Sequence, residues 1–106
     1  MNAATQARYE ARARVIKAMG HPSRLLILDE LAKGERCVCE LTDLVGADMS
    51  TVSRHLDILK SAGIIREEKR GSQVFHTLQV PCVLKFMNCI ESVLKANAQA
   101  QLAFMK

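Results

Sequence analysis

No segment of this sequence is long and apolar enough to suggest a helix that crosses a membrane. Such a helix needs about 20 predominantly apolar residues, whereas the apolar run Leu25–Leu28 is bounded by a charged residue on each side. The chain also opens without a basic segment followed by an apolar one, so we expect no secretory leader. We therefore place the protein in the cytoplasm.

Proline and glycine are scarce, with two and five copies among 106 residues. Long irregular loops use more of both, so we expect short connections between regular elements. The chain is 49% hydrophobic and 25% charged, which argues against disorder. Its length suffices for one compact domain, expected to span residues 1–106, and this excludes a multidomain enzyme.

The formal net charge of +4 is unevenly distributed along the chain. Residues 1–24 carry five basic residues against one acid, and residues 49–106 carry eight against four. Between them, residues 29–48 hold six acids and only two bases. Two basic ends favour a polyanionic partner such as double-stranded DNA, although a charged run is also typical of a solvated face.

The hydrophobic pattern predicts a mainly α protein with a small β-hairpin. The expected order is a helix over 5–19, a helix from Pro22 to Gly34, a helix over 37–45, a helix capped by Asp48 and ending near Gly63, strands over 64–69 and 73–78, and a last helix opened by Pro81. About three residues join the third and fourth helices, the length of a helix-turn-helix connection. This order (ααααββα) predicts a winged helix-turn-helix, with its second helix the most buried.

Apolar residues on the two terminal helices predict a homodimer. The stripe on the last helix is too wide to remain exposed, and a chain of this size covers it most simply with a second copy. The interface between copies is expected to contain Tyr9, Ile16, Val83, Met87, Ile90 and Leu94.

The polar face of the fourth helix carries the residue types that read DNA. Arginine can bond guanine bidentately, and short hydroxyl side chains allow close approach to base edges. The expected DNA contacts on this helix are Ser50, Thr51, Ser53, Arg54 and His55. The alternative is a solvated amphipathic helix in which His55 is buried or capping. At the hairpin tip, Lys69, Arg70 and Ser72 suit contacts to the neighbouring backbone or minor groove.

Four cysteines in a chain placed in the cytoplasm are expected to be free thiols, available for metal or redox chemistry or for core filling. Cys37 and Cys39 form a Cys-x-Cys pair. In a regular helix such residues lie about 200° apart, so they can share an ion only where the backbone is extended or frayed. The first turn of a helix permits this, and ligand binding there is expected to distort the start of the third helix.

Cys82 and Cys89 are weaker candidates for ligation. Their spacing puts them about 10 Å apart along one helix, too far for both to hold one ion. Either could complete the site of Cys37 and Cys39 as a third ligand or meet its equivalent across a dimer, and Cys89 also suits a plain buried thiol. His21 and His76 are expected to be structural.

The whole pattern resembles the ArsR/SmtB family of metal-sensing transcriptional repressors. The resemblance rests on HPSRLLIL (His21 to Leu28), CVCEL (Cys37 to Leu41), STVSRHLDILKSAGII (Ser50 to Ile65) and RGSQVFHTL (Arg70 to Leu78). It implies a homodimer that sits on a palindromic operator without ligand and leaves when a metal or metalloid binds. It also assigns DNA reading to the helix that contains Arg54.

The cysteine pattern is similar to that of the arsenic-responsive branch, in which a Cys-Val-Cys binds trivalent arsenic or antimony. Cys37 and Cys39 match it, and the resemblance therefore implies arsenite or antimonite as the inducer. Thr42 stands where that branch often has a further cysteine. The N-terminal cysteines of cadmium and lead sensors and the Asp-x-His pair of zinc sensors have no counterpart, since residues 1–36 lack cysteine and residues 81–106 lack aspartate and histidine.

Two other functions compete with this interpretation. A repressor of the same fold that senses oxidants or persulfides would pair Cys37 or Cys39 with Cys82 or Cys89. A small thiol oxidoreductase or arsenate reductase is disfavoured, because the pair is not Cys-x-x-Cys and no βαβ pattern surrounds it. We expect no enzyme and no catalytic residue. A winged helix that binds only proteins would leave Arg54 and Lys69 unexplained.

Overall fold

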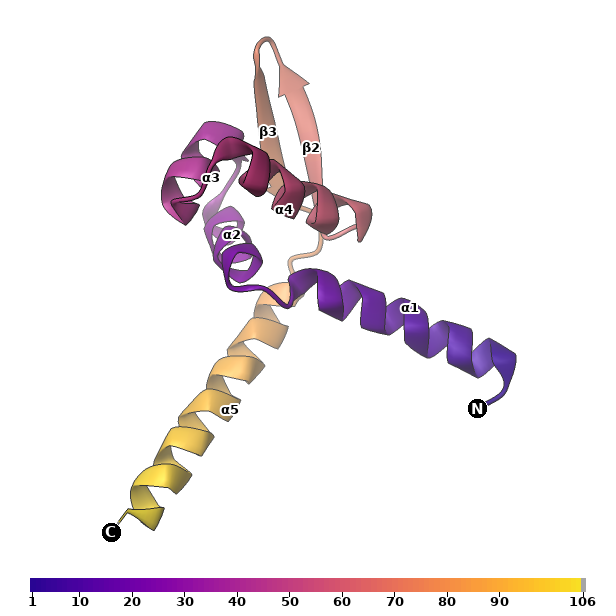
Figure 1. Cartoon of the computed structure of the whole chain (residues 1–106), viewed down its shortest axis with the longest axis vertical. Helices are drawn as coiled ribbons and strands as arrows, with labels where there is room; N and C mark the ends of the chain where they lie inside the picture. The colour runs from indigo at the N-terminus through magenta and orange to yellow at the C-terminus, as the bar shows by residue number, and fades with distance from the viewer. Residues whose placement is uncertain (106) are drawn as a thin grey trace.

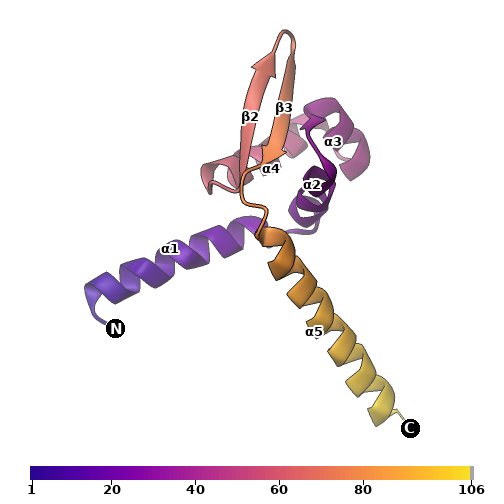
Figure 2. The same cartoon turned by 180° about the vertical axis from the view of Figure 1, so that it is seen from behind.

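The computed structural model describes residues 1–105 and forms a body with two projecting arms (Figure 1). The elements are α1 (Ala3–Met19), α2 (Pro22–Lys33), β1 (Arg36–Cys37), α3 (Val38–Val45), α4 (Met49–Ser61), β2 (Ile65–Arg70), β3 (Gln73–Leu78) and α5 (Val83–Phe104). Helices α2 to α4 and the hairpin form the body, and α1 and α5 leave it in diverging directions in both views (Figure 2). The predicted element order is confirmed apart from β1.

Local signals set the boundaries of the helix-turn-helix. The Asp48 carboxylate accepts the backbone N–H of Thr51 at 2.8 Å and caps α4. Gly46 ends α3 in the left-handed conformation, with φ at 75°, which costs a residue without a Cβ little. Residues 46–48 are therefore the whole connection between α3 and α4, as the spacing predicts.

The wing is a three-stranded antiparallel sheet with the order β1-β3-β2. In the hairpin Arg70 pairs with Gln73, and Gly71, with φ at 61°, supplies the positive angle at the first position of the two-residue turn. Strand β1 pairs Cys37 with Phe75. The third helix begins at Val38, next to its expected start near Cys37, and Cys37 itself is extended because it pairs along the edge of β3.

The core lies where α2, α3 and α4 meet the base of the wing. Its fully buried members include Ile27, Leu41 and Leu59. The expectation that α2 is the most buried helix is wrong, because it buries three side chains whereas α4 buries four, and Leu26 on α2 is 40% exposed. The apolar run on α2 faces the core on one side only.

The arms make the protomer much less compact than its length requires. A compact domain of this size has a radius of gyration of about 13 Å, whereas this chain has 16.7 Å. Helix α1 buries only its last residues, Ala18 and Met19, and α5 buries only Val83. No helix within residues 1–105 is long and apolar enough to span a membrane.

His76 is enclosed at the base of the wing and is 2% exposed. Its Nε2 lies 3.4 Å from a Glu67 oxygen, and its Nδ1 has no hydrogen-bond partner in the described chain. Desolvation lowers the pKa of His76, although the Glu67 carboxylate opposes that shift. The folded protein therefore holds this imidazole neutral at a pH where the unfolded chain binds a proton.

We expect stability to fall as the pH drops through 6.5, the ordinary histidine value, because only the unfolded state gains the proton. For one histidine the loss between pH 7.5 and 5.5 is at most about 1.4 kcal/mol. Urea unfolding at both pH values should show a smaller difference for His76→Gln than for the wild type. An equal difference in the two proteins would contradict this account of His76.

Candidate nucleic-acid interface and thiol site

The outward face of α4 carries three of its five expected DNA contacts. Ser50, Thr51 and Arg54 are exposed, and Arg54 forms no ion pair with any described residue. The Ser50 hydroxyl donates to the capping Asp48 carboxylate at 2.8 Å. Ser53 is half-buried and lines a cavity of about 130 Å³ between α4 and the wing, so it is less accessible than these three residues.

His55 turns away from the outward face of α4. It is 9% exposed, its ring lies 4.4 Å from that of His21, and its Nδ1 accepts the Nε–H of Arg24 at 3.2 Å. Desolvation, with the charges of His21 and Arg24, lowers the pKa of His55. The buried alternative for His55 is therefore the one found, and the residue joins α4 to α2 instead of facing solvent.

The two cations at the tip of the wing differ in their partners within the described chain. Lys69 and Ser72 are exposed, and Lys69 has no ion-pair partner within residues 1–105. Arg70 donates to the two Glu35 oxygens at 2.6 and 2.7 Å and to Glu68 at 2.8 Å. These bonds raise the pKa of Arg70 further and hold its guanidinium over the Phe75 ring.

The two cysteines of the Cys-x-Cys pair lie in different local structures. Cys37 is the extended N-cap of α3, with ψ at 162°, and is buried, whereas Cys39 is in the first helical turn and exposed. A reciprocal capping box joins Cys37 to Glu40: the sulfur accepts the Glu40 N–H, and the carboxylate accepts the Cys37 N–H at 3.2 Å. The pair thus avoids the regular helical geometry that would prevent a shared ion.

The electrostatic surroundings of Cys37 favour the neutral thiol. The backbone N–H of Glu40 stabilises the thiolate, but desolvation and the Glu40 carboxylate together outweigh it and raise the pKa of Cys37. Arg36 does not relieve this effect, since its guanidinium is held by Glu30 at 3.2 Å and by Glu40 at 3.9 Å. A ligand at Cys37 must therefore displace a firmly held proton.

Within residues 1–105, the pair has no third side chain beside it that would complete a metal site. Cys82 and Cys89 are exposed free thiols on the α5 arm. Among residues 1–105 there is no group of three histidine, cysteine or acidic side chains that could hold a metal ion. The hydroxyl of Thr42 donates to the Val38 carbonyl at 2.8 Å inside α3.

The residues expected at a dimer interface divide into two groups. Tyr9, Ile16 and Leu94 are more than half exposed on the arms, at 51%, 55% and 56%, and Ile90 is 38% exposed. Val83, in contrast, is 9% exposed and packs in the protomer's own core, with the half-buried Met87 beside it. Val83 therefore has little surface to offer a second copy.

Sequence reasoning did not single out the junction between α1, α2 and α4. There Arg24 donates to the Ala18 carbonyl at 2.9 Å and to His55, so one side chain ties three helices together. Two further cations, Arg14 and Lys17, lie beside it and line the same groove as Arg54. The only sequence signal for them is the basic character of residues 1–24.

A helix-turn-helix with an exposed cationic second helix and a β-wing defines the class of winged helix-turn-helix DNA-binding proteins. Residues 21–67 match the family model of the bacterial regulatory proteins of the arsR family. An uncharacterised HTH-type transcriptional regulator of Methanocaldococcus jannaschii is 44% identical over 65% of this chain and 79% of its own length. The chain belongs to the ArsR family of transcriptional regulators, and its relatives are named regulators, which confirms the expectation that it is not an enzyme.

Solved structures of related regulators share this fold. A homodimeric winged helix-turn-helix DNA-binding domain of a possible ArsR-family regulator from Mycobacterium bovis covers 94% of this chain and 93% of its own, with 28% identity and a TM-score of 0.79. The antimony-specific transcriptional repressor AntR covers 93% of this chain and 90% of its own, with 26% identity and a TM-score of 0.74. The chain spans about half the length of two further curated relatives, at 51%.

Removing the charge of Glu40 should lower the pKa of Cys37. Glu40→Gln keeps an oxygen for the capping box and deletes the carboxylate that opposes the thiolate, so the pKa should move toward its ordinary value. The measurement is a titration of thiolate absorbance in a protein with Cys37 as its only cysteine, made by Cys39→Ser, Cys82→Ser and Cys89→Ser.

Glu35→Gln is the matched control for that titration. It deletes a carboxylate two residues from Cys37 that is engaged by Arg70, so it should leave the pKa of Cys37 unchanged. Equal shifts in the two variants would contradict the specific role of Glu40.

Proposed function

We propose that this regulator is a homodimeric repressor that binds a palindromic operator and leaves it when trivalent arsenic or antimony binds Cys37 and Cys39. One observation carries the proposal: Cys37 is at once the strand partner of Phe75 in the wing and the N-cap of α3 in the helix-turn-helix. A ligand at this residue therefore acts on the wing directly and on α4 through α3, the helix that precedes it in the helix-turn-helix.

DNA reading is assigned to the exposed face of α4 and to the wing tip. Arg54, with no internal ion pair, is the residue available for bidentate contact with guanine, and Ser50 and Thr51 are short enough to reach base edges or phosphates. Lys69 and Ser72 reach the neighbouring backbone. Arg70 contributes only if it leaves Glu35, so it ranks below Lys69.

Dimerisation is supported by the two arms and by the homodimeric relative. The exposed apolar residues lie on α1 and α5, which project from the body. These projecting helices account for the large radius of gyration. A second copy that covers Tyr9, Ile16, Ile90 and Leu94 would bury them. To read a palindrome, such a dimer must also hold its two α4 helices about one DNA turn apart, roughly 34 to 36 Å.

The donor set favours a soft, thiophilic ion as the inducer. The two donors of this site are thiols, and thiolates bind soft ions in preference to hard ones. The similarity to the antimony-specific repressor supports trivalent arsenic or antimony in particular. The third position of the ion is left to a thiol of the second copy or to hydroxide from solution, because residues 1–105 of one protomer supply no third side chain.

Release follows from a conformational equilibrium shared by ligand and operator. The ion stabilises a backbone at residues 37–39 that differs from the one that holds the wing and α3 in their DNA-binding positions. A ligand that prefers one state lowers affinity for the partner of the other. Couplings of about 1 to 3 kcal/mol weaken binding roughly 5- to 150-fold, which is enough to switch a promoter.

Replacing both cysteines should separate sensing from DNA binding. Cys37→Ser with Cys39→Ser should keep its affinity for a duplex selected from a random pool by the wild-type protein, and arsenite should no longer release it. Fluorescence anisotropy measures both. Release of the double variant by arsenite would refute the sensor assignment, and release by peroxide of the wild type alone would favour the redox alternative.

Arg54→Ala should weaken binding to the selected duplex by about 1 to 3 kcal/mol, because a bidentate base contact is lost. Binding to random duplexes should change much less. Lys95→Ala, which removes one charge from the exposed α5 arm, is the control for net charge. A gel-shift comparison in which the two variants behave alike would rule out base reading by Arg54.

A further inference from the structure

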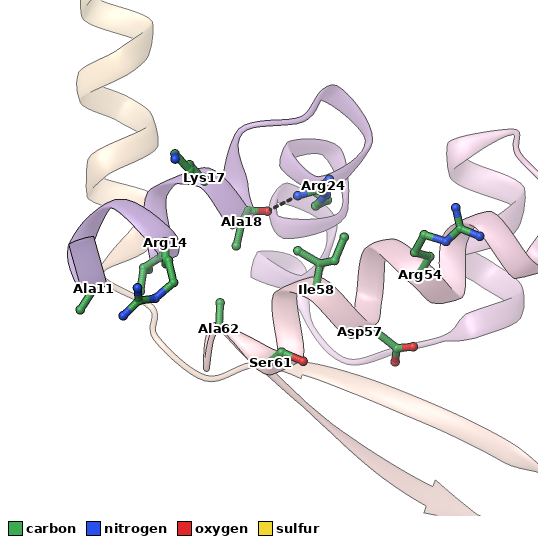
Figure 3. Close-up of a pocket in the computed structure, with 11 residues that line it drawn as sticks. Ala11, Arg14, Lys17, Ala18, Arg24, Arg54, Asp57, Ile58, Ser61 and Ala62 are labelled. Carbon is green, nitrogen blue, oxygen red and sulfur yellow. Dashed lines mark hydrogen bonds between the residues drawn. The ribbon is translucent and has the colours of Figure 1, made fainter. Parts of the chain in front are cut away.

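A basic groove separates α1 from α4 and is continuous with the exposed face of α4 (Figure 3). Its volume is about 690 Å³, and it runs from the outward side of α4, past the end of that helix, to the middle of α1. Its lining comes from residues 11–18 of α1, Arg24 of α2, and residues 54–62 from α4 and its C-cap. The groove is thus an extension of the surface already assigned to DNA.

The groove carries an excess of positive charge that the protomer does not neutralise. Arg14, Lys17 and Arg54 form no ion pair within residues 1–105, and Arg24 donates only to a carbonyl and to His55. Asp57 is the single acid of the lining. Four cations against one carboxylate around a concave surface attract a polyanion.

The floor of the groove suits a phosphodiester strand. Ala11, Ala18 and Ala62 are small, so they leave width between α1 and α4, and Val15 and Ile58 give the floor an apolar surface. Deoxyribose rings can pack on such a floor while the phosphates reach the cations on the rim. A free duplex backbone offers that alternation of apolar sugar and charged phosphate along its length.

The groove faces away from the residues of α1 that are expected at the dimer interface. Ala11 lies two residues after Tyr9, and Ala18 two residues after Ile16, and two residues correspond to about 200° around a helix. The face of α1 toward the groove is therefore opposite the face that carries the exposed Tyr9 and Ile16. A second copy that covers Tyr9 and Ile16 leaves the groove open.

We propose that this groove is a second DNA-binding surface, which holds the sugar-phosphate backbone that flanks each half-site through Arg14 and Lys17. The inference rests on the proposed function, since it requires α4 in the major groove with Arg54 at the shared edge of both surfaces. Arg24 is the positioning residue: its bond to the Ala18 carbonyl holds α1 against the body, so the two cations stay on the rim. The contacts carry no sequence information.

The test is the salt dependence of binding. Each phosphate contact contributes about 0.9 to the slope of log affinity against log salt concentration, and a dimer makes every contact twice, so Arg14→Gln and Lys17→Gln should each reduce the slope by about 1.8. Both variants should weaken binding to the selected duplex and to random duplexes by the same factor. The matched control is Arg8→Gln, the same change on the same helix outside the groove, which should leave the slope unchanged.

Duplex length provides a second readout. On a long duplex, the salt dependence of the wild type should be steeper than that of Arg14→Gln. On a duplex trimmed to the recognised bases, the two proteins should show equal slopes. Equal slopes for all proteins on the long duplex, or an equal loss in Arg8→Gln, would overturn the proposal. A change in the dimer mass of Arg14→Gln by sedimentation, with its slope intact, would overturn it in favour of a groove between copies.

Failure of the proposed function gives a different result. If the wild type shows no preference for any selected duplex and Arg54→Ala binds like the wild type, the assignment of α4 to base reading fails. If the wild type prefers the selected duplex and Arg54→Ala binds it more weakly, but the salt slopes of Arg14→Gln and Lys17→Gln match that of the wild type, then only the proposed role of the groove fails.

Discussion

The antiparallel pairing of β1 with β3 is the contact on which the arrangement of this protein depends. It is only two residues long, yet it lies between the end of α2 and the start of α3 and attaches both to the wing. Without it the wing would be a two-stranded hairpin, which is marginal by itself in water. With it, the hairpin is joined through Cys37 to the start of the helix-turn-helix in one sheet.

The charge pairs of the wing add a second connection between the same segments. Arg70 at the tip of the hairpin is bonded to Glu35, just before β1, and its guanidinium covers the ring of Phe75, the strand partner of Cys37. Each of these exposed pairs contributes little to stability by itself. They instead help to fix the register of the hairpin against β1, and with it the part of the wing that faces Cys37 and Cys39.

The parts of the fold that are coded locally could be predicted from the sequence, and those that depend on distant contacts could not. The Asp48 cap, Gly46 and the Gly71 turn each act within a few residues. In contrast, Arg70 meets Glu35 across 35 positions and Arg24 meets His55 across 31. Periodicity carries no signal for such pairs. For that reason the sequence leaves the burial of His55 open and does not predict the pairing of β1.

The candidate sites follow the same division. The cysteine pair and the outward face of α4 are contiguous in sequence, so residue type and spacing indicate them. The groove between α1 and α4 joins residues 11–18 to residues 54–62. The burial of Ala18 and Met19 in the core, together with the bond from Arg24 to the Ala18 carbonyl, brings these segments together.

The burial of one sulfur beside an exposed one has a kinetic consequence. Cys39 is open to solvent, whereas Cys37 is 7% exposed, hydrogen-bonded and paired within a sheet. Under the proposed function, a soft ion meets the exposed Cys39 first, and binding to Cys37 as well requires β1 to separate from β3. Both the arrival and the departure of the ion would then depend on the opening of this two-residue strand.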